Sequence, residues 1–217
     1  MSPPVTASTE TVVLLHGIAN VPLSMAYIKR GLEKEGYNVL NLGYQSTRST
    51  VEGAASELHD RVVSAVRGGK IHFVAHSLGN IVVRKMLAGP FSNLGRMVMI
   101  TPPNRGSELS ERFKDLELYK WIFGPAGQQL SSDNSAFFDS LPVPPCQFGI
   151  IAGGKGNDRG FNPLLKGDND GTISVDTTRM ESASDFIIID SLHTMILFSR
   201  ETLEQVAFFL RNGKFRY

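Results

Sequence analysis

Residues 71–79 read IHFVAHSLG, and this stretch decides the fold that we expect. Its first part, residues 71–75, is a short run of apolar and β-branched residues, which is typical of a strand buried on both faces. A helical pattern over residues 79–87 follows almost at once. The stretch therefore predicts a strand, a sharp turn with Ser77 at its tip, and a helix.

Similar apolar runs occur on both sides of this stretch. They predict further strands at residues 11–16, 37–42, 96–100, 148–152 and 186–190. Helical patterns lie between them, at residues 22–35, 50–66, 109–123 and 202–210. Strands that alternate with helices form parallel sheets, because the helices supply the crossovers. We therefore expect an α/β fold with about six mostly parallel strands and helices on both faces.

Length and composition bound the kind of protein. The 217 residues predict a single domain, residues 1–217, and 41% hydrophobic with 20% charged residues is typical of a globular chain. Lys and Arg number 22 against 21 Asp and Glu, so no strong electrostatic field favours nucleic acid. The sequence contains no uncharged run of 18 apolar residues, so we expect no transmembrane segment. The oligomeric state stays open.

Several chemistries lack their motifs in the sequence. The single cysteine, Cys146, excludes an internal disulfide and a multi-cysteine metal site. HExxH, P-loop and GxGxxG patterns are absent, and the acidic run from Asp168 fails the EF-hand pattern because its twelfth residue is Arg179. We therefore expect no cofactor and no metal. Because the first basic residue is Lys29, we expect a cytoplasmic protein if the chain is complete, and a secreted or periplasmic one if a signal was trimmed.

The turn at residues 75–79 carries the strongest signal for chemistry. The residues two before and two after Ser77 are Ala75 and Gly79, which are small enough for a nucleophile elbow. The serine would then stand at the carboxyl edge of the sheet. The N–H of Leu78, at the start of the helix, would face developing negative charge. A tight turn with an inert, buried serine has the same small residues, so both interpretations stay open.

A second loop opens at the same edge, directly after the first predicted strand. Gly17 permits an unusual backbone angle, and the Ile18 N–H is a candidate second donor to an oxyanion. A glycine that merely ends a strand is the alternative. We expect His16 to be structural, and we expect His76 to point away from Ser77 because neighbours along a strand diverge.

A candidate base and acid lie late in the chain. His193 alone among the five histidines combines a position after a strand with a late place in the sequence. For the carboxylate that orients it, Asp170 is our first choice, Asp168 the second and Asp176 the third. Asp, Asn and Gly are also common turn residues, so a purely structural loop is the alternative.

The order serine, aspartate, histidine is that of the α/β-hydrolases. The chain resembles this superfamily, and within it the small bacterial lipases and GPI inositol-deacylase-like esterases. The matching stretches are VLLHGI (13–18), AHSLG (75–79), TPPNRGS (101–107), DGTIS (170–174) and the late His193. The resemblance extends from about Thr11 to Phe209, nearly the whole chain. It implies a reduced α/β-hydrolase fold, although Ala75 departs from the common GxSxG pattern.

The resemblance implies roles for individual residues. Ser77 would be the nucleophile, Asp170 the acid and His193 the base, while the N–H groups of Ile18 and Leu78 would form the oxyanion hole. The implied activity is a lipase- or esterase-like serine hydrolase that cleaves a small-molecule or lipid carboxylic ester through an acyl-enzyme. A thioesterase or an acyltransferase would use the same triad, and a non-catalytic binding protein of this fold is a further alternative.

The long stretch at residues 102–145 interrupts the alternation of strands and helices. We expect a lid or cap inserted there, built on the helical piece at residues 109–123; a crossover helix with padding is the alternative. We expect the wall of an acyl groove from Ile18, Val21, Leu23, Met25 and residues 121–123, with ordinary core packing as the alternative. Such a lid would allow transient contact with a lipid interface.

Overall fold

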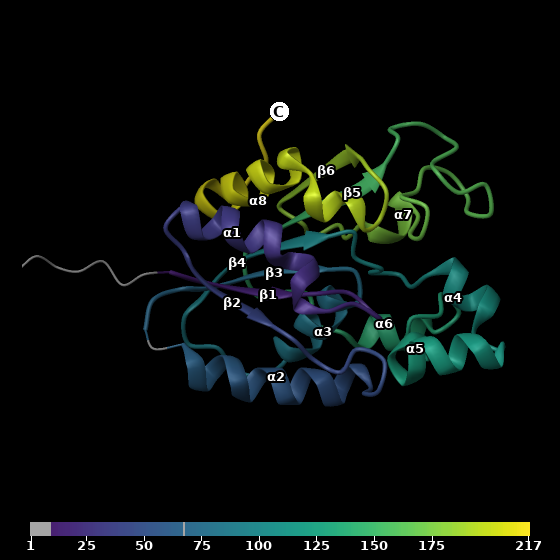
Figure 1. Ribbon diagram of the computed structural model, residues 1–217, viewed down its shortest axis with the longest axis horizontal. Helices are drawn as coiled ribbons and strands as arrows, with labels where there is room; N and C mark the ends of the chain where they lie inside the picture. Colours follow the sequence, from purple (N-terminus) through teal and green to yellow (C-terminus); the bar gives the residue numbers. More distant parts are fainter. Residues whose placement is uncertain (1–9, 67) are drawn as a thin grey trace, which may run out of the picture.

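The computed structural model describes residues 10–66 and 68–217, and its centre is one six-stranded sheet (Figure 1). All strands run parallel, in the order β2-β1-β3-β4-β5-β6. The strands are β1 (Thr11–Leu15), β2 (Asn38–Leu42), β3 (Ile71–His76), β4 (Leu94–Ile100), β5 (Phe148–Gly154) and β6 (Asp185–Asp190). The predicted fold class is thereby confirmed, with strand limits that differ by only one or two residues.

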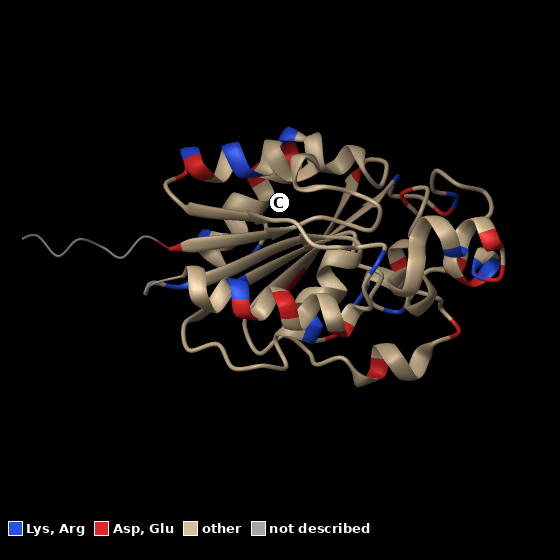
Figure 2. Ribbon diagram, turned by 60° about the horizontal axis from the view of Figure 1, so that its bottom comes forward, with Lys and Arg blue, Asp and Glu red and all other residues tan. Residues whose placement is uncertain are grey.

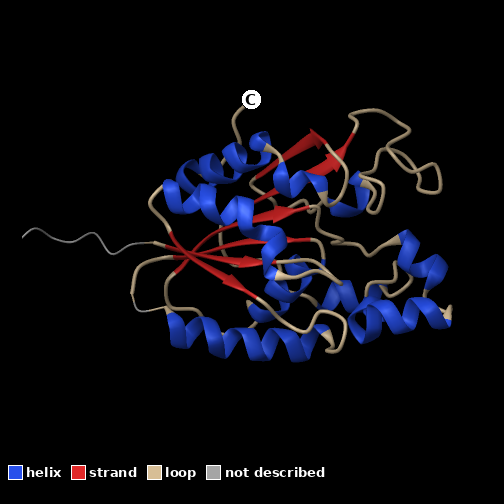
Figure 3. Cartoon of the chain, in the orientation of Figure 1, coloured by secondary structure: helices blue, strands red, loops and turns tan. Residues whose placement is uncertain are grey.

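Helices cover both faces of this sheet (Figure 3). One face carries α1 (Ala26–Lys34) and α8 (Arg200–Asn212), with the short 3-10 helices η1 (Pro22–Met25) and η2 (Met195–Phe198). The other face carries α2 (Val51–Ala65) and α3 (Leu78–Met86). The alternation of strand side chains explains this arrangement: Val13 of β1 packs toward α2 and α3, whereas its neighbour Val12 packs toward α1 and α8.

Local capping fixes where the longer helices begin and end. The Thr50 hydroxyl accepts a hydrogen bond from the Gly53 N–H at 3.2 Å before α2. The Ser199 hydroxyl does the same for the Thr202 N–H at 3.3 Å before α8. Gly213 ends α8 with a left-handed backbone, φ +73°. These residues fix the start of α2 and both ends of α8, two of the helices that pack on the sheet.

The stretch at residues 102–145 holds three helices, which lie beyond the carboxyl ends of the strands (Figure 1). They are α4 (Glu108–Phe113), α5 (Glu117–Gln129) and α6 (Ser135–Ser140), and α7 (Val175–Thr178) follows between β5 and β6. The prediction of one continuous helix over residues 109–123 is wrong, because two helices occupy this stretch. The helix breaks after Phe113 and resumes at Glu117, and α5 is kinked at Gly124, where φ is +58° and Pro125 follows.

Gly124 is needed at that kink for a second reason. A Cβ placed there would clash with the carbonyl oxygen of Thr47, in the loop after β2. The backbone of α5 therefore packs closely against this loop at Gly124. The Gln129 side chain of α5 adds a further contact, because its Oε1 accepts from the Val51 N–H at 2.8 Å.

Charged residues of both signs alternate along the outer helices and loops, as Figure 2 shows. The strands carry few of them, in keeping with a sheet buried on both faces. Within residues 10–66 and 68–217, no helix combines the length and the apolar character needed to span a bilayer.

Candidate active site

Ser77 stands at the tip of the turn between β3 and α3, in a strained backbone conformation. Its φ is +50° and its ψ is −125°, a region that non-glycine residues rarely adopt. Hydrogen bonds hold it there: the Ser77 N–H donates to the Ile100 carbonyl at 3.0 Å, and Asn80 Nδ2 donates to the Ser77 carbonyl at 3.1 Å. The predicted elbow geometry is therefore present.

The two glycines around this turn are required by close contacts, with backbone atoms at Gly79 and with side chains at Gly17. A Cβ on Gly79 would lie 2.7 Å from the His16 carbonyl oxygen and 2.8 Å from that of Leu15. A Cβ on Gly17 would lie 2.9 Å from His76 Nδ1 and 3.1 Å from Ser77 Cβ. The loop after β1 thus packs directly against the serine turn, as its place in the sequence predicted.

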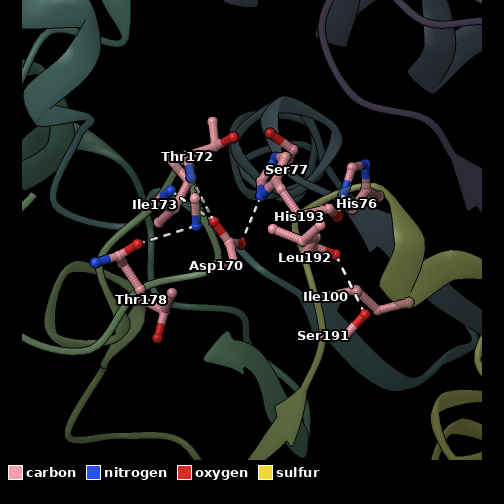
Figure 4. Close-up of polar contacts among 12 residues, drawn as sticks. His76, Ser77, Ile100, Asp170, Thr172, Ile173, Thr178, Ser191, Leu192 and His193 are labelled. Atoms are coloured by element: carbon pink, nitrogen blue, oxygen red, sulfur yellow. Dashed lines mark hydrogen bonds and ion pairs between the residues drawn. The ribbon is translucent and has the colours of Figure 1, made fainter. Parts of the chain in front are cut away.

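His193, in the loop after β6, is bound to Asp170, in the connection between β5 and β6. The His193 Nδ1 lies 2.6 Å from Asp170 Oδ2, and the His193 N–H donates to the Asp170 carbonyl at 2.9 Å. The other carboxylate oxygen, Oδ1, accepts from the N–H groups of Thr172 at 2.9 Å and Ile173 at 2.7 Å. Asp170 is only 1% exposed, and these hydrogen bonds hold its carboxylate in one orientation (Figure 4).

The two other candidate carboxylates have different surroundings. Asp168 accepts from the backbone N–H groups of Lys155 and Gly156, each at 2.8 Å, and so closes the loop after β5. Asp176 lies exposed in the first turn of α7. Of the three, it is Asp170 that the structure brings to His193.

His76 does not point away from the site, contrary to our expectation. Its ring lies beside that of His193, with the centroids 4.8 Å apart, and its Nε2 is 2.9 Å from the His193 carbonyl oxygen. It lines the same cavity as Ser77. The alternation rule failed because β3 ends at His76, and the turn that begins at Ser77 has left the regular strand geometry.

The two backbone N–H groups predicted for an oxyanion hole come from the loop after β1 and from the first residue of α3. Ile18 and Leu78 both follow the carboxyl end of a strand, and in the described ranges neither N–H donates a hydrogen bond within the chain. His16 has a structural setting, as expected. It is buried, its ring stacks on Tyr44 at 4.6 Å between centroids, and the Tyr44 hydroxyl donates to its carbonyl at 2.8 Å.

Ser77 and His193 open into one cavity of about 350 Å³. Its apolar walls come from the loop after β1, from the stretch that holds α4 and α5, and from the connection between β5 and β6: Ile18, Leu109, Phe113, Tyr119, Phe123, Leu130 and Ile173. No Lys, Arg, Asp or Glu of the described part of the chain lines it. Larger hollows, of about 730 and 680 Å³, lie elsewhere and contain neither Ser77 nor His193.

The predicted wall of the acyl groove is only partly correct. Ile18 and Phe123 line the cavity, but Met25 is fully buried in the core between α1 and the sheet. Val21 and Leu23 are exposed and lie outside the lining, as do Trp121 and Ile122. Phe113 and Tyr119 also line the cavity but were not predicted, because their place in the wall depends on the division of this stretch into α4 and α5.

Comparison with solved structures places this fold among bacterial lipases and esterases. The mature lipase BlEst2 of Bacillus licheniformis is similar with a TM-score of 0.71 and 18% identity, over 89% of this chain and 88% of that one. Phospholipase PlaB of Legionella pneumophila is similar with a TM-score of 0.73 and 15% identity, over 96% of this chain but only 60% of that one. These likenesses show the α/β-hydrolase fold.

The protein encoded by gene lin2722 of Listeria innocua is similar over 96% of both chains, with a TM-score of 0.65 and 15% identity. No curated protein sequence matches this chain. A family match does extend over residues 7–123, more than half of the chain, and it includes both the loop after β1 and the serine turn. The chain therefore belongs to the family described as "Putative serine esterase (DUF676)".

Proposed function

We propose that this protein is a serine hydrolase that cleaves carboxylic esters, with Ser77 as nucleophile, His193 as base and Asp170 as acid. One observation carries the proposal. The serine of a strained strand-to-helix turn and a histidine bound to a buried carboxylate line the same neutral cavity. Membership of a serine esterase family supports the same activity.

In the first half of the reaction, His193 Nε2 takes the proton of the Ser77 hydroxyl as Oγ attacks the ester carbonyl carbon. Asp170 accepts a hydrogen bond from Nδ1, which fixes the tautomer and stabilises the imidazolium that forms. The Ile18 and Leu78 N–H groups donate to the oxyanion of the tetrahedral intermediate. His193 then returns the proton to the leaving alcohol as the C–O bond breaks, and an acyl-enzyme remains.

The second half consumes water. His193 removes a proton from a water molecule, the resulting hydroxide attacks the acyl carbon, and the oxyanion again lies at the two N–H groups. Collapse of this intermediate breaks the bond to Ser77 Oγ, which recovers its proton from His193. The products are a carboxylic acid and the free enzyme.

The walls of the cavity favour an uncharged, apolar acyl group. Around the site, the loops after β1 and β6 and helix α5 also expose large apolar side chains: Val21, Leu23, Leu118, Trp121, Leu192 and Met195. Scattered apolar residues are normal on a surface, but here they come from segments that surround one cavity. This supports a lipid ester as substrate and transient contact of these segments with a lipid interface.

A fluorophosphonate, which reacts only with an activated serine, tests the proposal. We expect one adduct in the intact mass of the native protein and none in Ser77→Ala. A series of p-nitrophenyl esters and one acyl thioester would then separate esterase, lipase and thioesterase. Folded protein without an adduct, both with and without detergent, would overturn the proposal in favour of a non-catalytic binding protein.

A further inference from the structure

His76 lies where three parts of the site meet, and the mechanism above does not use it. It is the last residue of β3 and directly precedes Ser77. Its ring lies against that of His193, and its Nδ1 faces the Cα of Gly17 closely enough that a Cβ there would lie 2.9 Å away. The side chain is 2% exposed. It therefore contacts the nucleophile's strand, the base and the loop of the oxyanion hole.

The hydrogen bond of His76 determines its tautomer. Its Nε2 lies 2.9 Å from the carbonyl oxygen of His193, and a carbonyl only accepts, so Nε2 carries the proton. Its Nδ1 has no partner within the described chain and bears the bare lone pair. Burial, followed by the nearby His193 and His16, lowers the pKa of His76 to about 3. His76 thus stays neutral while an imidazolium forms at His193.

With this bond, His193 is held at three points. Its N–H donates to the Asp170 carbonyl, its Nδ1 pairs with the Asp170 carboxylate, and its own carbonyl accepts from His76. The first two bonds fix the base relative to the acid. Only the third fixes it relative to β3, whose next residue is Ser77.

We propose that His76 is a positioning residue that sets the distance and orientation of His193 relative to Ser77. The inference rests on the proposed function, because it concerns how the base of that reaction is held. An apolar side chain of similar size would also pack against Gly17 and His193, but it could not donate a hydrogen bond. The Nε2–H of His76 does donate one, and no other side-chain donor among the described residues reaches the His193 carbonyl.

Two pairs of variants test the proposal. His76→Gln keeps an N–H at nearly the reach of Nε2, whereas His76→Asn keeps the amide but is too short. His76→Leu fills similar space without any donor. His72→Leu is the matched control, because His72 is a second histidine of β3 that is 1% exposed, and it bonds Glu10 and the Arg96 N–H at the other end of the strand.

We expect kcat of His76→Leu and His76→Asn to fall roughly 10- to 100-fold with KM within about twofold, since small misplacement of a base costs about that much. His76→Gln should stay within about fivefold of the native protein. The acid limb of the kcat/KM profile should move in His76→Leu and His76→Asn, because the base is held differently. The ionisable side chains around His76 are His193, with its partner Asp170, and His16. His72→Leu should lower only the melting temperature.

Equal kcat and equal pH profiles for the native protein, His76→Asn and His76→Gln would overturn the inference, even if His76→Leu fails to fold. So would a loss in His76→Gln as large as in His76→Asn. Failure of the proposed function gives a different result, because the native protein itself would then neither hydrolyse esters nor form the Ser77 adduct.

Discussion

His193 meets Asp170 through both its main chain and its ring: its N–H donates to the Asp170 carbonyl at 2.9 Å, and its Nδ1 lies 2.6 Å from the carboxylate. This double contact joins the loop after β6 to the connection between β5 and β6. The ring contact alone would not fix the main chain of the loop. With both contacts, the position and the orientation of the imidazole relative to Asp170 are fixed.

The first prediction separates Asp170 from its neighbour Asp168. We expect Asp170→Asn to lower kcat by roughly 10³- to 10⁴-fold, because an amide can stabilise the wrong tautomer of His193 and cannot offset the charge of the imidazolium. Asp168→Asn is the control, since the donors to Asp168 among the described residues are backbone N–H groups, and it should change kcat by less than about tenfold. Steady-state hydrolysis of one ester checks both, and equal losses would contradict the assignment.

A second prediction concerns the close contact under the serine turn. Gly79→Ala should destabilise the fold by about 1–3 kcal/mol, because the new methyl group meets two backbone carbonyls that cannot move aside. The methyl group of Gly53→Ala in α2 meets the Ser49 hydroxyl, which can rotate aside, and the Thr50 hydroxyl at an ordinary contact distance, so this change should raise stability by about 0.5–1 kcal/mol. Urea unfolding measures both free energies. A neutral Gly79→Ala would mean that the turn is looser than the structure describes.

Acyl-chain preference is the third prediction. Phe123→Ala would enlarge the cavity on the side formed by α5, so the ratio of kcat/KM for dodecanoyl over butanoyl esters should rise roughly tenfold, since room for about two more methylenes is worth about 0.8 kcal/mol for each. Trp121→Ala, two residues away but outside the cavity, is the control. The same rise in both variants would indicate a general loosening of α5.

Trp121 provides the fourth prediction. Its side chain is 82% exposed beside the site. We expect Trp121→Ala to weaken binding to phosphatidylcholine vesicles in a sedimentation assay, while hydrolysis of a short, water-soluble ester stays unchanged. Tyr217→Ala removes an 88% exposed aromatic residue in the chain's C-terminal segment and should leave vesicle binding as it is. Equal binding by all three proteins would count against contact with a lipid interface.

The fifth prediction concerns stability against pH. Burial lowers the pKa of His76 to about 3 and also lowers the pKa values of His16 and His72. Below about pH 6.5 these histidines bind protons in the unfolded chain but not in the folded one. The free energy of unfolding therefore falls as the pH drops from about 6.5 toward 3. Each histidine contributes at most about 1.4 kcal/mol per pH unit. Urea unfolding at a series of pH values should show a shallower fall for His76→Gln, and an unchanged slope would contradict the assignment.

The sheet and the serine turn were predictable because their causes are local. Runs such as residues 71–75 are apolar throughout, and small residues at positions 75 and 79 are what a tight turn needs, so short stretches of sequence carry the information. The three carboxylates were harder to rank. Asp168 and Asp170 are two residues apart, and only the course of the loop decides which of them reaches His193.

The helices beyond the sheet were the least predictable part. The stretch divides after Phe113, and the backbone of Gly124 lies close to the distant Thr47, a contact that no local pattern reports. The role of His76 was hidden for a similar reason. Its partner is the backbone carbonyl of a residue 117 positions away. Every residue has a backbone carbonyl, so the sequence does not indicate which of them accepts this hydrogen bond.

The strand order has a consequence for the newly made chain. The proposed base follows β6, an edge strand and the last of the six in sequence order, whereas the proposed nucleophile follows β3 in the middle of the sheet. A chain still emerging from the ribosome therefore carries Ser77 long before it carries His193. Under the proposed roles, Ser77 becomes reactive only when β6 has joined the sheet, so covalent labelling of Ser77 during translation would report when β6 docks.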